Sequence, residues 1–508
     1  MNNRNVSFLL TGLALAALSA LLRFWAFSQT PFANGWDSYF YLVQLKSLEE
    51  TGRMHSPEAS LIYPYLRLFY WLTGDYVTGM KTGVAMLCGF WVAALYFFPP
   101  YHGARWPAGI ALFSPQLTYF AAQYPKNLLG LLLLWLFIWS VDQQKSRRLV
   151  WVAPAVLLVL NYFGHRMTFG LALLYLVVYL AVHLRTFISA DILKKALIAG
   201  AAVLGLFFLA GQFLPGLAHV ADMGRLQGII SAMPQFAPWS FMQTFDFQRI
   251  SACWLFEIGA VTALFLWNMF VFFRQKNHPA LPLLLLCAVL IFPFLEWSTT
   301  GLAWRFWMVF ILLVPVACLS RIRVPGGEIG VVCCYLLLLG GSFFSWKSYQ
   351  PALHDPDYGQ FQRITERVQQ YFNGVSALHA KSPGRLERPG DLASRPELVI
   401  AHNALAEFYT FTTGTDAMPW LPEYAIDSSR LWRIAAGVRL PTLQYFAKKE
   451  NDLKIKDLGG KYYLLPEYVW QQALARARAE QDSDFLEIAE SWRNPWKMRP
   501  GWLLRKKG

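Results

Sequence analysis

Trp36-Asp37-Ser38-Tyr39-Phe40-Tyr41-Leu42 follows the first long apolar run of the chain, and its aromatic residues surround one carboxylate. A charge at a lipid–water boundary is costly unless it has a partner or a chemical role. Taken alone, Asp37 fits an exposed residue of an aromatic loop better than it fits a functional acid. The other polar groups beside the apolar segments are predicted to lie on the same side, and this favours the functional interpretation.

The composition is typical of a polytopic membrane protein. Of the 508 residues, 56% are hydrophobic and only 15% are charged, which is less charge than a soluble protein of this size carries. Apolar runs of roughly 16–22 residues, long enough to cross a bilayer as helices, recur through the first two-thirds. About 11 transmembrane helices are predicted, near residues 6–27, 78–98, 106–122, 127–141, 150–163, 167–183, 196–214, 252–273, 280–296, 303–319 and 329–346.

The formal charge of +14 does not indicate a nucleic-acid partner, because the cations alternate from loop to loop. Lys and Arg gather in every second loop, as expected for loops that face the cytoplasm. These loops hold His102 and Arg105, Lys145 to Arg148, Arg185 to Lys195, Arg274 and Lys276, and Arg321 and Arg323. The pattern predicts a multi-pass protein of the inner (plasma) membrane, with a cytoplasmic N-terminus and Asp37 on the extracytoplasmic side.

The first apolar run resembles an uncleaved membrane span more than a signal peptide. Arg23, Trp25 and Phe27 near its end are typical of an interfacial anchor, and no clear small-residue cleavage site follows. An outer loop over residues 28–77 comes next. Within it, the helical spacing of apolar residues in 39–51, stopped by Gly52, predicts an amphipathic helix on the membrane surface.

Two domains are predicted from the change in composition near residue 347. Residues 1–346 form the membrane domain, and residues 347–508, where charges are frequent and long apolar runs stop, form a soluble extracytoplasmic domain. Short strand-like runs at 397–401 and 461–465 alternate with helical ones, which favours a mixed α/β fold.

The predicted topology does not explain the positions of four cationic or polar residues. Lys126 is in a very short outer turn, His165 and Arg166 join two apolar runs, and Arg305 begins a late span. Simpler explanations exist: Lys126 can snorkel from a helix start, and Arg305 can close a helical hairpin with Glu296. Alternatively, all four converge with Asp37 on one outer cavity and bind the phosphate of an anionic, membrane-embedded substrate.

Such a site suits group transfer from a lipid phosphate. Asp37 would take the proton of an attacking hydroxyl, and the cations would stabilise the charge on the leaving phosphate. Glu58, Asp75 or Glu296 could supply a second acid, although Asp75 after Gly74 more simply caps a helix. No P-loop and no Rossmann glycine pattern is present, so a nucleotide donor is not indicated.

These positions and their order resemble the GT-C superfamily of integral-membrane glycosyltransferases. The resemblance rests on Trp36-Asp37-Ser38-Tyr39-Phe40 after the first span, Tyr63-Pro64-Tyr65, the turn Gln123-Tyr124-Pro125-Lys126-Asn127, and Arg305-Phe306. It covers about residues 1–346. It implies that Asp37 is the catalytic residue, that Arg305 contacts the lipid-linked phosphate, and that a polyprenyl-phosphate or polyprenyl-diphosphate sugar is the donor for inverting transfer.

The chain also departs from that family. It has no Trp-Trp-Asp-Tyr-Gly-like motif for a peptide acceptor, so the acceptor is left open between a glycan, a lipid and a protein. Lys126 stands where the family has an acidic residue, which argues against a Mg²⁺ or Mn²⁺ site shared with Asp37. Glu58, Asp75 or Glu296 could still supply a second ligand for such a divalent metal. An O-antigen ligase or polymerase-like transferase, a transporter or flippase for lipid-linked sugars, and a non-catalytic scaffold are the alternatives.

Overall fold

The computed structural model consists of two compact units, which we describe separately. The helical unit comprises Met1–Gly35 and Glu58–His354, and the mixed unit comprises Trp36–Pro57 and Asp355–Gly508. The residues that the structure describes are 3–52, 54–55, 58–99, 105–143, 152–187, 252–275, 280–291, 303–319, 327–348, 358–359, 361–363, 365–366, 369, 399–401, 403–414, 417–419, 462–466, 492–493 and 501–506.

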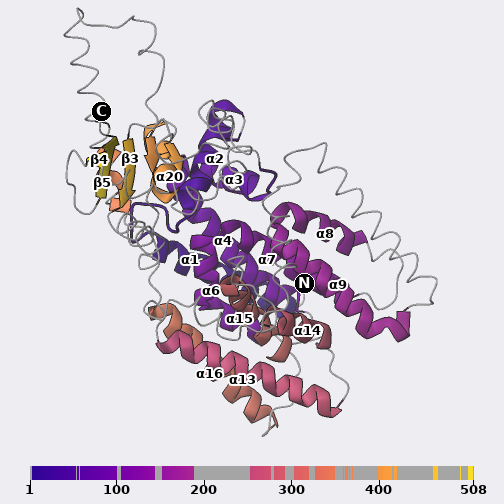
Figure 1. Cartoon of the computed structure of the whole chain (residues 1–508). Helices are drawn as coiled ribbons and strands as arrows, with labels where there is room; N and C mark the ends of the chain where they lie inside the picture. Colours follow the sequence, from indigo (N-terminus) through magenta and orange to yellow (C-terminus); the bar gives the residue numbers. More distant parts are fainter. Residues whose placement is uncertain are drawn as a thin grey trace, which may run out of the picture. The chain divides into compact units, whose positions relative to one another are not determined.

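Long apolar helices make up the described part of the helical unit (Figure 1). They are α1 (Asn3–Phe27), α3 (Ile62–Thr73), α4 (Tyr76–Phe97), α5 (Trp106–Leu112), α6 (Pro115–Gln123), α7 (Pro125–Asp142), α8 (Val152–Gly164), α9 (Arg166–Phe187), α13 (Ala252–Gln275), α14 (Leu281–Leu290), α15 (Ala303–Leu319) and α16 (Gly327–Ser348). Helix α1 packs along α4, α7 against α8 and α9, and α13 along α16. Trp91 and Trp135, both fully buried, join α4 to α7 with ring centroids 6.4 Å apart.

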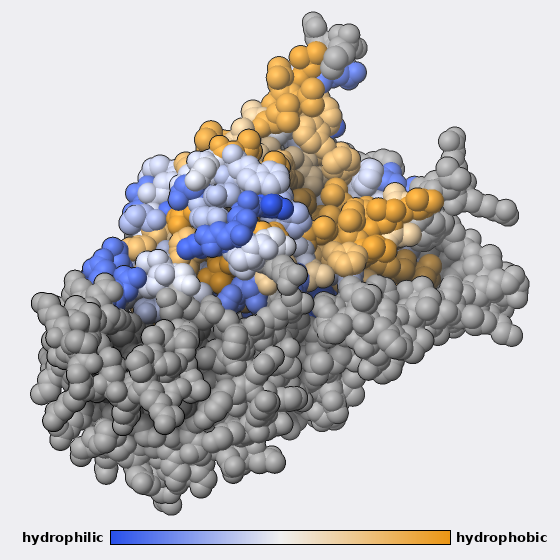
Figure 2. Space-filling model, turned by 90° about the horizontal axis from the view of Figure 1, so that it is seen from above, coloured by the Kyte–Doolittle hydropathy of each residue, from blue (hydrophilic) through white to orange (hydrophobic). Residues whose placement is uncertain are grey.

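The surface of these helices is that of a membrane protein. In the described part of the chain, four helices are long and apolar enough to cross a bilayer, over Asn5–Phe27, Tyr76–Phe97, Pro125–Asp142 and Phe256–Arg274. Hydrophobic side chains lie exposed on them, among them Leu21 (64% exposed). Figure 2 shows the broad hydrophobic areas that result. The predicted total of about 11 spans stays a prediction, because residues 196–214 lie outside the described range.

One predicted span is wrong as a continuous helix. Residues 106–122 form two helices, α5 and α6, separated at Phe113 and Ser114. Pro115 has no N–H group and forces an extended ψ of 118° on Ser114. The Ser114 hydroxyl then accepts a bond from the Leu117 N–H at 3.3 Å and so begins α6.

Arg23 is not the interfacial anchor that its position predicts. It is fully buried, and its guanidinium donates to the carbonyl oxygens of Ala111 (3.2 Å), Leu112 and Ser114 (3.0 Å) at the break between α5 and α6. A helix end inside a bundle leaves carbonyl groups without partners. The buried arginine therefore satisfies the acceptors that the break exposes, with a further bond at 3.0 Å to the Ser19 hydroxyl.

A chain of hydrogen bonds continues from this break to a second buried charge. The Ser114 hydroxyl donates to Gln116 Oε1 at 2.7 Å, and Gln116 Nε2 donates to Glu257 Oε2 of α13 at 3.1 Å. The Ser342 hydroxyl of α16 donates to the other carboxylate oxygen at 2.7 Å. Five helices are thereby connected through polar groups in the bundle core.

The described part of the mixed unit contains two helices described over their full length, helical residues within 358–369, and one sheet. The helices are α2 (Ser38–Thr51), ended by Gly52 at φ +69°, and α20 (Asn403–Thr413). The strands are β1 (Val399–Ala401), β2 (Ala417–Pro419), β3 (Tyr462–Pro466), β4 (Trp492–Arg493) and β5 (Gly501–Lys506). Their order is β2-β1-β3-β5-β4, with β1 parallel to β2 and β3, and β5 antiparallel to β3 and β4. Strands β1 and β3 lie at the two predicted strand-like runs.

Helix α2 confirms the predicted helix after Asp37 but has a different partner from the one expected. Its first aromatic residue, Tyr39, is 3% exposed and packs on Phe408 of α20 and on Tyr358, with ring centroids 4.7 and 4.8 Å away. Lys46 donates to the Phe411 carbonyl at 3.0 Å. The apolar residues of α2 are therefore used within the mixed unit rather than on a lipid surface.

Candidate functional site

The turn between α6 and α7 carries the first of the predicted cations. Helix α7 begins with Pro125, whose ring fixes a helical φ and whose missing N–H would have no partner there anyway. Tyr124 precedes it without a side-chain cap, and Lys126 follows in the first helical turn. The positive end of the helix dipole and the ammonium group therefore lie together.

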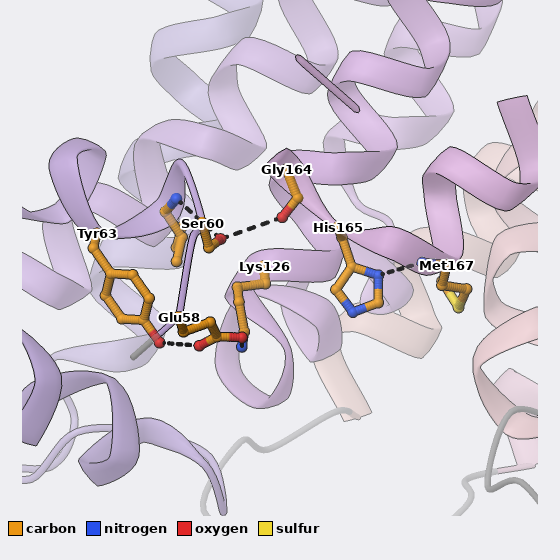
Figure 3. Close-up of polar contacts among 8 residues, drawn as sticks. Glu58, Ser60, Tyr63, Lys126, Gly164, His165 and Met167 are labelled. Atoms are coloured by element: carbon orange, nitrogen blue, oxygen red, sulfur yellow. Dashed lines mark hydrogen bonds and ion pairs between the residues drawn. The ribbon is translucent and has the colours of Figure 1, made fainter. Parts of the chain in front are cut away.

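Glu58, in the loop before α3, forms an ion pair with Lys126 (Figure 3). One carboxylate oxygen forms an ion pair with Lys126 Nζ, and the other accepts a bond at 2.5 Å from the Tyr63 hydroxyl at the start of α3. The side chains of Lys126 and Glu58 are only 16% and 22% exposed. The pair is therefore partly shielded from water, which makes it stronger than an ion pair on an open surface.

The turn between α8 and α9 lies against the same loop. The Leu61 N–H donates to the Phe163 carbonyl at 2.9 Å, and the Ser60 hydroxyl to the Gly164 carbonyl at 3.4 Å. His165 follows, and its Nδ1 accepts from the Met167 N–H at 3.2 Å (Figure 3). These bonds fix the loop beside the start of α9, whose first residue is the predicted Arg166.

Two glycines allow these helices to approach closely. A Cβ atom on Gly130 of α7 would lie 2.3 Å from the Thr168 hydroxyl and 2.8 Å from His165 Cβ. One on Gly164 would lie 2.8 Å from the Leu133 side chain. The helix that carries Lys126 is therefore packed directly against the turn that carries His165 and Arg166.

Arg305 and Arg166 both lie over tyrosine rings. The guanidinium carbon of Arg305, in the first turn of α15, is 4.0 Å from the centroid of Tyr124, and that of Arg166 is 5.9 Å from Tyr162. Among the described residues, Arg305 has no hydrogen bond or ion pair, so the ring face holds the cation while its N–H donors are unused. Because Tyr124 is two residues before Lys126, the structure brings these two predicted cations to one turn.

The predicted acids fall into different environments. Asp75 accepts a bond at 2.7 Å from the Thr78 N–H and caps α4, as its simpler interpretation predicts. Asp37 belongs to the mixed unit, where it precedes α2 at φ −94° and ψ 3° without capping it through its side chain. Its exposure is intermediate. Glu296, predicted as a salt-bridge partner of Arg305, lies outside the described residues.

The sequence interpretation missed Lys81. This lysine is in the span α4 yet is only 7% exposed, and its ammonium group donates to the Thr30 carbonyl at 2.5 Å. It lines a small recess with Asn34, Met80 and Ala122, among others. A lysine inside an apolar run was the available signal, since an intramembrane charge is rare without a structural or functional reason.

Comparison with solved structures shows which known fold the chain has. It superposes on an oligosaccharyltransferase from Archaeoglobus fulgidus, crystallised with Zn and sulfate, with a TM-score of 0.53 and 13% identity over 90% of this chain and 68% of that one. It superposes on ArnT from Cupriavidus metallidurans, bound to undecaprenyl phosphate, with a TM-score of 0.53 and 10% identity over 99% and 98%. Both are GT-C glycosyltransferases. The chain has a GT-C-like fold. No protein-family model and no curated protein sequence matches it.

The GT-C-like fold raises the question of a metal, because one of these neighbours was crystallised with Zn. Of the predicted acids, Glu58 has both oxygens occupied by Lys126 and Tyr63, and Asp75 caps a helix. The described residues hold no group of three His, Cys, Asp or Glu side chains close enough to bind an ion. A cation beside Glu58 would also repel a metal, so these residues do not fit one.

Proposed function

We propose that the chain is a membrane glycosyltransferase that moves a sugar from a polyprenyl-phosphate or polyprenyl-diphosphate donor to an acceptor on the extracytoplasmic side. The likeness in fold to two membrane glycosyltransferases supports the reaction class. ArnT was crystallised with undecaprenyl phosphate, and this supports a donor on a polyprenyl carrier. The proposal places the N-terminus in the cytoplasm and residues 347–508 outside the cell membrane.

The observation that carries this proposal is the position of Arg305. Its guanidinium carbon lies 4.0 Å from the centroid of the Tyr124 ring, and its N–H groups make no hydrogen bond or ion pair with the described residues. Lys126, which follows Tyr124 by two residues, adds a second cation at the start of α7. Arginine donors in a fixed plane, next to an ammonium group and a helix N-terminus, match the oxygens of a phosphate. Two residues complete the proposed set of donors: Arg166, which begins the neighbouring α9, and His165, which precedes it.

In the proposed reaction Asp37 is the general base. The hydroxyl oxygen of the acceptor attacks the anomeric carbon of the donor, and its proton passes to the Asp37 carboxylate. The bond from the anomeric carbon to the phosphate oxygen breaks, and its electron pair leaves with the polyprenyl phosphate. Arg305 and Lys126 stabilise the charge that develops on that oxygen. Attack from the face opposite the leaving group inverts the configuration.

Chain connectivity limits how far Asp37 can lie from Gly35. Gly35, the last residue of the helical unit's first segment, lies so close to α6 that a Cβ atom would be 1.9 Å from the Ala122 carbonyl oxygen. Asp37 follows it by two residues, and two residues span at most about 7 Å. Ala122 is itself two residues before Tyr124, which holds Arg305.

A transfer assay tests the proposal. Purified full-length protein in nanodiscs is mixed with radiolabelled polyprenyl-phosphate sugars and a membrane extract as the source of acceptor, with and without EDTA. We expect label to leave the carrier with the wild type and not with Asp37→Asn, and we expect EDTA to have no effect. Label that stays on every carrier, with a well-folded protein, would contradict the assignment.

One observation favours a transporter of lipid-linked sugars as a second candidate. The α5–α6 break and the buried charges Arg23 and Glu257 lie inside the bundle, and broken helices with buried charges are found in transporters. Reconstitution in liposomes separates the two candidates. A transporter would move a fluorescent polyprenyl-phosphate sugar across the bilayer without cleaving it, whereas the proposed enzyme would cleave it only when an acceptor is present.

A further inference from the structure

Lys126, the cation proposed to bind the donor phosphate, already holds an anion of this chain. The Glu58 carboxylate occupies its ammonium group, and both side chains are largely shielded from water. A phosphate that binds Lys126 would place its negative charge beside Glu58. Two anions in a partly buried site repel each other more strongly than in water, so the carboxylate and the phosphate compete for the same cation.

The second contact of Glu58 gives the displaced carboxylate a place to stay. Its other oxygen accepts a bond of 2.5 Å from the hydroxyl of Tyr63, which is 1% exposed and fixed in the core. The Tyr63 hydroxyl is neutral and does not compete for the phosphate. Glu58 can therefore leave Lys126 while it keeps one strong hydrogen bond.

The loop that carries Glu58 is anchored at the residues that follow it. The Ser60 hydroxyl donates to the Gly164 carbonyl of the α8–α9 turn (Figure 3). The Leu61 N–H donates to the Phe163 carbonyl at the end of α8. Glu58 lies just before these anchors, in a stretch without helix or strand. A rotation of its side chain away from Lys126 therefore requires none of the anchoring bonds to break.

We propose that Glu58 is an internal competitor of the donor phosphate. It holds Lys126 while the site is empty, moves to the Tyr63 hydroxyl alone when phosphate binds, and takes Lys126 back when the polyprenyl phosphate product leaves. Glu58 thus lowers the affinity for phosphate in exchange for faster product release. This inference rests on the proposed function, because it requires Lys126 to contact the phosphate.

The test is a binding measurement on the full chain in nanodiscs, with undecaprenyl phosphate as the probe. Glu58→Gln keeps the size of the side chain and removes its charge, so we expect about fivefold tighter binding. Tyr63→Phe is the matched control, because it removes a neutral hydrogen bond from the same carboxylate; its affinity should stay within about twofold of the wild type. Glu58→Ala serves if the Gln variant does not fold, and the same gain is expected.

A double-mutant cycle attributes the gain to Lys126. In a Lys126→Met background, Glu58→Gln should no longer tighten binding. Binding by Glu58→Gln that is unchanged or weaker, or a gain that persists without Lys126, would overturn the proposal. If the wild type and every variant fail to bind the probe while remaining folded, the proposed function fails instead, so the two failures are distinguishable. Saturable wild-type binding without a gain contradicts only the competition.

Discussion

Arg305 lies 4.0 Å above the ring of Tyr124, and the two residues come from helices that are far apart in sequence. The ring immobilises a long cationic side chain without using its hydrogen-bond donors. A guanidinium prepared in this way loses less conformational entropy when it binds an anion than one that moves freely in solvent. The pair therefore gives the clearest starting point for experiments on the proposed site.

Changing Arg305 to Ala should weaken donor binding and leave the KM for the acceptor unchanged. A hydrogen bond to a charged group contributes about 1.5–3 kcal/mol, so the donor KM should rise about 10- to 100-fold. Steady-state kinetics with donor and acceptor varied separately measure this. Arg166→Ala should act in the same direction. A change confined to the acceptor KM would rule out the role of either arginine as a phosphate ligand.

Changing Asp37 to Asn should abolish transfer without unfolding the protein. Loss of a general base reduces a rate by about 10²–10⁴-fold, and the Asn side chain has nearly the same volume. Single-turnover transfer is the measurement. Asp75→Asn is the matched control, because Asn also caps a helix and the Asp75 side chain accepts only the Thr78 N–H among the bonds described; this variant should keep its activity. Near-normal rates for Asp37→Asn would exclude Asp37 as the base.

Changing Arg23 to Met should destabilise the helical unit. The substitution removes the buried hydrogen bonds that Arg23 donates to the carbonyl groups of Ala111, Leu112 and Ser114, which we expect to cost about 2–4 kcal/mol. Thermal unfolding of the protein in detergent gives the change. Arg67→Met is the control, since Arg67 stacks on the exposed ring of Trp71 at 4.7 Å, and its loss should matter little. Equal effects of the two variants would refute the role assigned to Arg23.

Changing Gly130 to Ala should disturb the turn that carries His165 and Arg166. The new methyl group would overlap the Thr168 hydroxyl at 2.3 Å, and we expect a loss of about 1–3 kcal/mol in stability together with weaker donor binding. A Cβ atom on Gly170 of α9 would meet nothing within 4 Å, so Gly170→Ala should be tolerated. Unfolding temperature and donor KM report the two effects. Wild-type behaviour of the Gly130 variant would contradict the close packing of α7 on α9.

Local patterns in the sequence predicted local structure well. The helix after Asp37, its end at Gly52 and the cap at Asp75 each depend on residues within one or two turns. The family resemblance was carried by short motifs in order, and the likeness in fold to two GT-C glycosyltransferases confirms it.

Contacts between distant segments could not be predicted in the same way. Glu58 and Lys126 are 68 residues apart, and no periodicity links them. Hydropathy made Arg23 an anchor because it detects a charge near the end of an apolar run but not the carbonyl groups that a broken neighbour exposes. Pro115 was visible in the sequence, yet a proline in an apolar run is compatible with a kink as well as with two separate helices.

Gly35 adopts φ +105° against the Ala122 carbonyl, where no side chain fits. This contact fixes the point from which the chain continues to Asp37. Asp37 follows two residues later, so its α-carbon stays within about 7 Å of this fixed point. One carboxylate in a sphere of that radius corresponds to an effective concentration of roughly 1 M. In the proposed reaction, an insertion of several residues after Gly35 should dilute the acid and slow the transfer of the sugar.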